Sequence, residues 1–584
     1  MKSKKFQMKT TVFNKNILAL SVACMPYLAF SQHVTPDAGA LQHDIEQGLN
    51  KPAAPELNQP LGPPVAPAAQ PGELTVTPVQ FQFVGNTLLS NEQLTVALEG
   101  YLNTPLTFAQ LKQAADVVAV AYRNAGWFVR AYLPKQQITD GVVVIQIVEA
   151  RLGGVQIPQV NDSRVPASRL RATVLANQAV GEPINASNID RVLLLLDDLP
   201  GVGVTGAFVE GANEGETDLA LTVVDKALLN GNIAADNTGA RSTGAARASA
   251  NLGVNSPLGL GDLLLNNFVV SQGSDYVRSA YSLPVGYDGW RAGVHASYLH
   301  YDLVGAFAAL GATGTASTVG LEASYPVVRS VSENVNFSVA ADQKRYLNQA
   351  LSSAGATGPA ATVSDYPIRA LNFALNGASF DNWASGGGNA WGLNVVHGIV
   401  NLNGSPNQAN DAQAANTQGD YSKLMVNVSR QQNLTSNLSL YAVATTQFAS
   451  HNLDSSEKMY LGGPYGVRAY PVNEAGGSLG QTFTAELRAK LPEGWSWTTF
   501  YDYGHVQVNR FNAALNGSAL SQINDVSLAG LGTSLGWQSV EGIDLKATLA
   551  HRNGSNPLAN AQTGMDTDGS KALNRLWLTA SWAL

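Results

Sequence analysis

From about residue 230 to the C-terminus, apolar and polar side chains alternate along short segments separated by turn residues. Residues 423–429, 543–551 and 575–584 each place most apolar side chains on one face and polar side chains on the other. A period of two is that of a β-strand with one apolar face. Repeated segments of ~10 residues with this period predict a membrane-spanning β-barrel over residues 228–584.

A soluble antiparallel sandwich would alternate in the same way, but three features favour the membrane. Few charges fall on the apolar face, aromatic residues recur near segment ends, and the last strand reaches the final residue. Aromatic residues at strand ends suit the two membrane–water interfaces. Charged residues make up 13% of the chain, against about 25% in average soluble domains. Composition alone leaves a large secreted β-protein, such as a solenoid adhesin, as an alternative.

Residues 74–150 and 151–227 show the same order of elements, which is β-α-α-β-β. In the first unit, a strand at 79–83 precedes two helical segments, and strands at 127–134 and 142–150 follow. The second unit has similar length and the same order, although few residues are identical. Such self-similarity predicts two repeated α+β domains ahead of the barrel.

The first 31 residues have the pattern of a secretory signal peptide. Five lysines precede an apolar core at residues 17–30, and Ala29-Phe30-Ser31 offers a cleavage site. The core is shorter than the ~20 residues of a membrane helix, and no later apolar run approaches that length. Cys24, the only cysteine, lies in this signal, so we expect no disulfides. A lipoprotein signal is the minor alternative, because Ser21 stands where a lipobox usually has leucine.

Residues 32–73 combine an amphipathic helix with a Pro/Ala-rich linker. Leu41, Ile45 and Leu49 recur at a spacing of four, which predicts one short helix at about 36–50. A helix before a long extended linker is either a frayed tail or a detachable element. With a barrel downstream, we expect this plug-like helix to occupy the pore at rest.

The sequence offers no chemistry that points to an enzyme, a cofactor or a metal. Residues 532–536 match the nucleophile-elbow pattern, but that motif needs a strand–turn–helix context and here lies within an alternating strand. The eight histidines are scattered without cysteines nearby. An acidic chain without basic clusters also argues against nucleic acid as a partner.

Charged side chains fall on the lumen face of two consecutive predicted strands. Alternation places Asp502 opposite an aromatic-rich face, and Glu486 and Arg488 point the same way. Arg468 comes before both of these strands in the sequence, in a glycine-rich loop. From the residues alone, an exposed Arg468 and a merely lumen-facing Asp502 are as reasonable as a pair.

Several ordered motifs resemble the two-partner-secretion transporters of the outer membrane, which carry polypeptide-transport-associated (POTRA) domains. The segment LGGPYGVRAYP (461–471) resembles that family's V-R-G-Y loop, and FYDYG (500–504) resembles its F-x-D-x-G strand. FVGNTLLS, YRNAGWFVRAYLPKQQITDG and EARLG in the first repeat are typical of the same branch. The resemblance covers essentially the whole mature chain. It implies sixteen antiparallel strands preceded by two periplasmic POTRA domains.

The resemblance also implies a functional site inside the barrel, where the loop tip enters and Arg468 pairs with Asp502. The loop residues are Gly462, Gly463, Val467, Arg468 and Tyr470, and the lumen residues are Phe500, Asp502, Gly504, Glu486 and Arg488. Ala469 departs from the family pattern, which usually has glycine there. If that position needed a positive φ, alanine would strain the turn.

By the same resemblance, the POTRA domains capture an unfolded secreted exoprotein, of adhesin or haemolysin type, through its N-terminal secretion domain. Strand addition to the second strand of each domain would involve Trp127, Val129, Tyr132, Val204 and Phe208. The expected location is the outer membrane, in contact with its lipid, with the POTRA domains in the periplasm. The alternatives are a barrel-assembly factor and a passive porin or receptor. The sequence leaves the exported partner and the oligomeric state open.

Overall fold

The computed structural model describes residues 36–49, 75–158, 163–213, 215–514 and 517–584. The predicted signal peptide and the Pro-rich linker lie outside these ranges. Within them, no helix combines the length and apolarity needed to cross a membrane.

The first N-terminal domain packs two helices against a three-stranded sheet. Its elements are β1 (Thr75–Val76), β2 (Gln80–Val84), α2 (Asn91–Ala97), η1 (Glu99–Tyr101), β3 (Leu106–Thr107), α3 (Phe108–Asn124), β4 (Val129–Tyr132) and β5 (Val142–Glu149). The sheet order is β2-β5-β4. The apolar face of β5, with Val143, Ile145 and Ile147, is buried against the helices. A capping box at Thr107 and Gln110 begins α3.

The second domain repeats this architecture with β6 (Arg151–Gln156), α4 (Ala167–Asn177), α5 (Ala186–Asp197), β7 (Val202–Glu210) and β8 (Glu216–Asp225). Its sheet order is β6-β8-β7, so β7, like β4, is an edge strand. In both domains the central strand pairs parallel to the first strand and antiparallel to the edge strand.

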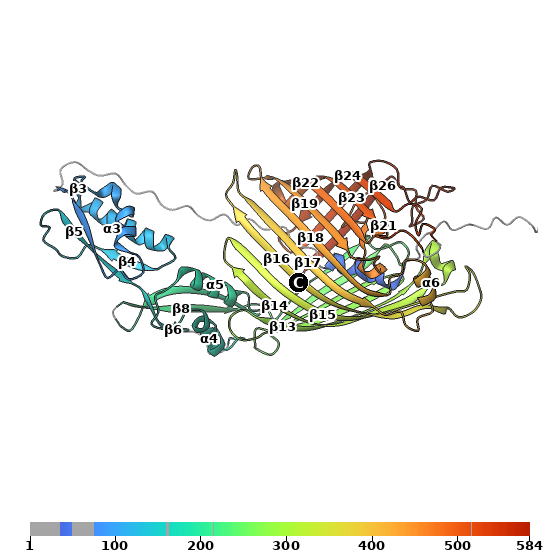
Figure 1. Cartoon of the computed structure of the whole chain (residues 1–584), viewed down its shortest axis with the longest axis horizontal. Helices are drawn as coiled ribbons and strands as arrows, with labels where there is room; N and C mark the ends of the chain where they lie inside the picture. Colours follow the sequence, from blue (N-terminus) through green and yellow to red (C-terminus); the bar gives the residue numbers. More distant parts are fainter. Residues whose placement is uncertain (1–35, 50–74, 159–162, 214, 515–516) are drawn as a thin grey trace, which may run out of the picture. The chain divides into compact units, whose positions relative to one another are not determined.

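In the described part of the chain, sixteen antiparallel strands close into a barrel, and β26 pairs with β9 at the seam (Figure 1). They are β9 (Leu229–Asp236), β10 (Arg247–Asn255), β11 (Leu263–Ser271), β12 (Ser274–Pro284), β13 (Arg291–Asp302), β14 (Thr313–Arg329), β15 (Glu333–Ala350), β16 (Ala361–Asp381), β17 (Gly387–Val400), β18 (Gly419–Asn433), β19 (Leu438–Ala449), β22 (Leu479–Lys490), β23 (Trp495–Gln507), β24 (Asp525–Gln538), β25 (Ile543–Arg552) and β26 (Asn574–Ala583). The predicted sixteen-stranded barrel is thereby confirmed.

Each barrel strand has one outward and one lumen-facing set of side chains. On β23, Trp495, Trp497 and Tyr501 are exposed on the outside, whereas Phe500 and Asp502 are buried on the inside. Connections at the end where β9 begins are short, and η4 (Pro492–Gly494) lies in one of them. The opposite end carries the long loops, with η2 (Gly305–Leu310) and α6 (Gln408–Gln413).

Two segments that are not part of the wall contact the lumen face. The first is α1 (Ala38–Leu49), drawn in blue among the barrel strands of Figure 1. The second is the loop between β19 and β22, which contains η3 (Ser455–Glu457), β20 (Met459–Leu461) and β21 (Ala475–Gly477). We call residues 459–477 the lumen hairpin.

Candidate functional site

Glycines fold the tip of the lumen hairpin back on itself. Gly462 and Gly463 have φ values of 89° and 77°, a region that side chains other than glycine rarely adopt. A Cβ on Gly466 would lie 2.7 Å from the carbonyl oxygen of Gly462. The backbone N–H of Gly463 donates to the carbonyl of Tyr470 at 3.0 Å. These contacts position the residues between the two ends of the tip.

Arg468 makes a forked ion pair with Asp502. Its Nη2 lies 2.7 Å from Oδ1 of Asp502 and its Nε lies 2.8 Å from Oδ2. The backbone N–H of Arg468 also donates to Oδ2 at 3.1 Å. Arg468 is 8% exposed and Asp502 is 1% exposed. Two parallel charge-assisted bonds in a buried setting fix both distance and orientation.

The wall supplies further partners to this pair. Nη1 of Arg468 lies 2.8 Å from Oε1 of Glu486. Its guanidinium carbon lies 3.4 Å from the centre of the Phe500 ring, in cation–π contact. Thr484 donates its hydroxyl to Asp502 at 3.0 Å. The structure therefore brings together residues from the hairpin, β22 and β23.

Glu486 also joins the pair to Arg488, which the sequence had placed on the same face. The Nη2 atom of Arg488 lies 2.6 Å from Oε2 of Glu486. Arg488 in turn lies 3.9 Å from the ring centre of Tyr441 and donates to Gln431 at 3.0 Å. The guanidinium of Arg468 and that of Arg488 thus share one carboxylate, and the network continues along the wall to β18 and β19.

The other motif residues shape the space around the pair. Val467 and Tyr470 are fully buried, and they belong to one apolar cluster with Phe500. A Cβ on Gly504 would lie 2.7 Å from Leu461 and 3.1 Å from Val467. Glycine at residue 504 therefore allows the hairpin to lie directly against β23.

Ala469 fits its position without strain. It is not among the residues with positive φ, so the doubt raised by the missing glycine does not apply. Its side chain is fully buried, and a Cβ on Gly530 of the facing wall would lie 2.6 Å from the Ala469 Cβ. The glycine at residue 530 therefore leaves room for the methyl group at 469.

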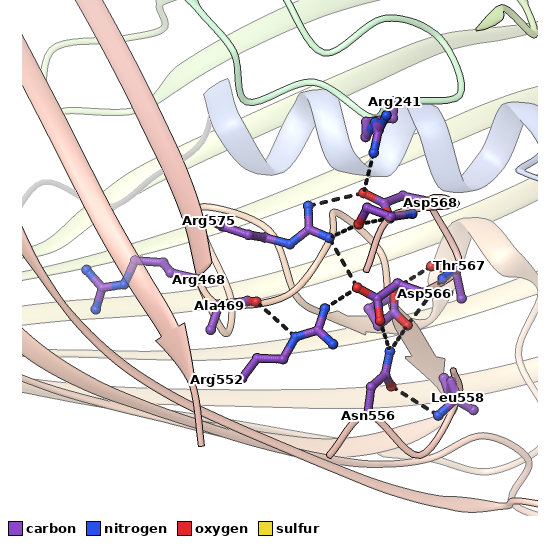
Figure 2. Close-up of polar contacts among 12 residues, drawn as sticks. Arg241, Arg468, Ala469, Arg552, Asn556, Leu558, Asp566, Thr567, Asp568 and Arg575 are labelled. Carbon is purple, nitrogen blue, oxygen red and sulfur yellow. Dashed lines mark hydrogen bonds and ion pairs between the residues drawn. The ribbon is translucent and has the colours of Figure 1, made fainter. Parts of the chain in front are cut away.

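A second polar network, which no sequence pattern indicated, holds the hairpin from its other side. Figure 2 shows Arg552 and Arg575, from the ends of β25 and β26, converging on Asp566 of the loop between these strands. Arg575 also lies 3.1 Å from Asp568. Arg552 donates to the carbonyl of Ala469 at 3.4 Å. Alternation could have placed both arginines in the lumen, but nothing in the loop sequence identified Asp566 as their partner.

Further contacts join this network to the hairpin. The Trp577 indole N–H donates to the carbonyl of Arg468 at 2.8 Å. Glu474 accepts a hydrogen bond from the Thr567 hydroxyl at 2.5 Å. Burial raises the pKa of Glu474 to about 7, and nearby Asp566 acts in the same direction. The hairpin is therefore tied both to the wall and to the last long loop.

Helix α1 contacts the lumen wall mostly through neutral groups. The Gln42 amide donates to Ser297 at 3.2 Å and to Thr318 at 3.0 Å. Leu41 and Ile45 pack in a buried cluster with tyrosines and aliphatic side chains of the wall. The ion pair between Asp44 of the helix and Arg247 of the wall is long, at 3.8 Å. The predicted helix thus lies against the lumen face of several strands.

The base of the lumen loop forms a seat for the beginning of α1. Asp37 accepts a hydrogen bond from Ser455 at 2.9 Å. A Cβ on Gly39 would lie 2.9 Å from Ser456, so the helix and η3 are in close contact. Next to this seat, Glu457 lies 2.7 Å from both Lys344 and Lys423 of the wall. No sequence pattern indicated Glu457 or its two lysines as a cluster.

The two predicted partner-binding strands, β4 and β7, differ in how many of their backbone N–H and C=O groups could pair with an added strand. Trp127 lies before β4 and forms a bridge with Asn185, so it is not part of a free edge. The Ala150 N–H donates to the Phe128 carbonyl, so in this antiparallel ladder Val129 and Ala131 direct their backbone groups away from β5.

The edge strand β7 of the second domain is open over part of its length. The Lys226 N–H donates to the Gly201 carbonyl, so every second residue from Gly201 pairs its backbone groups with β8. The residues between them, Val204, Gly206 and Phe208, direct their backbone N–H and C=O groups away from the sheet. The Val204 N–H, however, donates to Asp197 at 3.2 Å. Tyr132 ends β4, on the other domain, and its side chain is 40% exposed.

Models of known protein families match most of the chain. Residues 215–535 match the model of the haemolysin secretion/activation protein family ShlB/FhaC/HecB. Residues 75–150 match the model of the POTRA domain of ShlB type.

Relatives and solved structures extend the match over nearly the whole chain. The heme/hemopexin transporter protein HuxB of Haemophilus influenzae (strain 86-028NP) is 25% identical over 531 residues, which are 88% of this chain and 91% of that protein. The outer membrane transporter CdiB of Dickeya dadantii (strain 3937) is 23% identical over 70% of this chain and 71% of its own. The structure of CdiB from Escherichia coli has a TM-score of 0.68 at 18% identity, covering 94% and 98% of the two chains. That last likeness shows the shared fold.

Proposed function

Because this chain belongs to the haemolysin secretion/activation protein family ShlB/FhaC/HecB, we propose that it exports one secreted exoprotein through its own barrel. It is an outer-membrane β-barrel whose POTRA region lies in the periplasm. The relatives are named as transporters, and we propose no catalytic reaction for it. The export route would run from the periplasmic POTRA domains to the cell surface.

The filled lumen is the observation that carries this proposal. A closed wall of sixteen strands, within the described residues, surrounds two segments that belong to no wall strand. Both are held by side-chain contacts, so they can leave without breaking the backbone pairing of the wall. Wall side chains do not fill a barrel of about sixteen strands, which on its own leaves an aqueous channel. A lumen filled by separable segments suits a pore that opens for a chain.

We also propose a domain assignment for the whole chain. Residues 1–31 are a cleaved signal, 32–73 hold the plug helix and linker, and 74–150 and 151–227 are the two POTRA domains, with the barrel from 228 to 584. The edge strands β4 and β7 offer outward backbone groups that an extended polypeptide can pair with regardless of its side chains. We propose that they receive the unfolded N-terminal secretion domain of an adhesin or haemolysin.

Secretion by cells that lack and regain this protein tests the proposal. The deletion strain should lose one large exoprotein from the surface and the medium, and plasmid-borne protein should restore it. Other outer-membrane barrels should keep their normal amounts. A general loss of barrels would indicate an assembly factor instead, and unchanged secretion would indicate a passive pore.

A further inference from the structure

Strands β14, β15, β16 and β17 are neighbours in the barrel wall (Figure 1). Their register sets rows of side chains on the outer surface. One row consists entirely of apolar side chains that face outward: Ala323, Val339, Phe373 and Val395. The next row towards the long loops is apolar except for one histidine, and consists of Leu321, Ala341, Leu371 and His397. An apolar outer surface of this kind contacts the hydrocarbon of the membrane.

The polarity changes in the following row, where Val319, Gln343, Arg369 and Ile399 are neighbours. Arg369 and Gln343 are exposed on the outer surface. No hydrogen bond or ion pair joins either side chain to another described residue. An unpaired charge at this depth is costly unless it reaches a polar partner at the edge of the membrane. The wall itself offers Arg369 no such partner.

The side chains of these rows enclose a groove of about 420 Å³ on the outer face. Its floor is formed by small residues, Gly320, Ala341 and Ala370, and Leu321 and Leu371 rise on either side. Arg369, Gln343 and His397 line the polar end. The groove is therefore apolar along its length and basic at one end.

The basic end faces the outer leaflet. Strand β9 follows directly from the second POTRA domain, so the short connections lie on the periplasmic side and the long loops on the cell surface. β16 begins at Ala361 on the loop side and ends at Asp381 on the periplasmic side, and Arg369 is closer to its beginning. The neighbouring Arg345 is already paired with Asp365 at 2.9 Å, which leaves Arg369 as the open charge.

We propose that this groove binds lipid A, the phosphorylated glycolipid anchor of lipopolysaccharide in the outer leaflet. The Arg369 guanidinium would bind a lipid A phosphate, as arginine does in bidentate phosphate recognition. An acyl chain would lie over Ala341 between Leu321 and Leu371. Asp342 also lines the groove, but its carboxylate points to the other face of the wall, where it lies 3.0 Å from His295. The remaining side chains of the lining point outward or form the floor, so the site is separate from the export path.

Native mass spectrometry of the purified full-length protein with added lipid A tests the site. The wild type should retain one lipid A at protein-to-lipid ratios where Arg369→Gln retains roughly tenfold less, the loss expected for one charge-assisted bond. Ala341→Phe should fill the groove and weaken retention to a similar degree. Both positions face outward, so heat-modifiable migration of the folded barrel should remain unchanged in each variant.

Arg430→Gln is the matched control, because Arg430 lies at the periplasmic end of the neighbouring strand β18, where it pairs with Asp381 of β16 at 2.7 Å. Its retention of lipid A should equal that of the wild type. Wild-type retention by both Arg369→Gln and Ala341→Phe would overturn the proposal. Equal retention of dephosphorylated lipid A would also overturn it, since that lipid has no phosphate for Arg369 to bind. Equal retention of phosphatidylglycerol would overturn it as well, since the groove would then bind any anionic phospholipid and not lipid A in particular.

Discussion

Replacing Arg468 with alanine tests whether the lumen hairpin is held by its ion pair. The change leaves Asp502, 1% exposed, with only the Thr484 hydroxyl and one backbone N–H as donors. Removing one member of a buried pair costs about 3–5 kcal/mol, whereas an exposed pair contributes ~1 kcal/mol or less. Because both side chains are buried, we expect the docking free energy of the hairpin to fall by about 3 kcal/mol. That is more than a hundredfold in the docking equilibrium.

Hydrogen–deuterium exchange of residues 462–477 in bilayers measures the docking equilibrium, and secretion of the exported partner measures function. Arg468→Ala and Asp502→Ala should each raise exchange and reduce secretion while the barrel still assembles. The double variant should be little worse than either single one, because residues that act as a pair are not additive. Arg345→Ala, which removes an exposed pair on the outer wall, is the control. Fully additive defects, or normal secretion by Arg468→Ala, would refute the reasoning.

Three further predictions concern the plug helix, the domain edges and the pH dependence of the hairpin. Deleting residues 36–50 should raise single-channel conductance in planar bilayers and leave export largely intact, whereas unchanged conductance would make the helix a mere tail. Val129→Pro and Phe208→Pro should weaken partner binding in pull-down assays, because each removes a backbone N–H that points away from its sheet. Val129→Thr, which keeps the N–H, should bind normally. Unchanged binding by both proline variants would count against strand addition. The pKa of Glu474 is raised by burial from 4.5 to about 7, so the docked hairpin binds a proton that the undocked one releases. Exchange protection of the hairpin should therefore fall as the pH rises from about 4.5 to about 7 and then level off, and Glu474→Gln should abolish this dependence; a pH profile unchanged by Glu474→Gln would assign it to another group.

The barrel could be predicted from the sequence because strand alternation has a physical cause that acts at every residue. Lipid on one side and a polar lumen on the other impose a period of two. This period predicts Asp502 and Glu486 on the lumen face, where the structure has them. The partner of Asp502 could not be derived in this way. Arg468 lies in an irregular loop, where no period fixes the direction of a side chain, and only the resemblance to a family linked the two residues.

The contacts that were missed share this cause. The side chain of Asp566 is completely buried between two arginines. It lies in the loop 553–573, however, whose many glycine and small polar residues are typical of an exposed loop. Glu457 occupies a short helical turn, and its lysines come from β15 and β18, more than thirty residues away in the sequence. Local patterns carry no information on such pairings, because they arise only when the barrel closes and its loops fold inward.

If both lumen segments leave during export, as we propose, the chemistry of their contacts predicts the order. Helix α1 is held chiefly by neutral hydrogen bonds and apolar contacts, and each neutral bond contributes only about 1 kcal/mol because water replaces it. The hairpin is held by charged groups that become costly when one partner is withdrawn. The start of α1 also lies against η3 of the hairpin's own loop, through Asp37 and Gly39. Movement of that loop would break the seat of α1, whereas α1 can leave with every hairpin–wall ion pair intact. We therefore expect the helix to leave first, and undocking of the hairpin to be the later and more costly step in opening the pore.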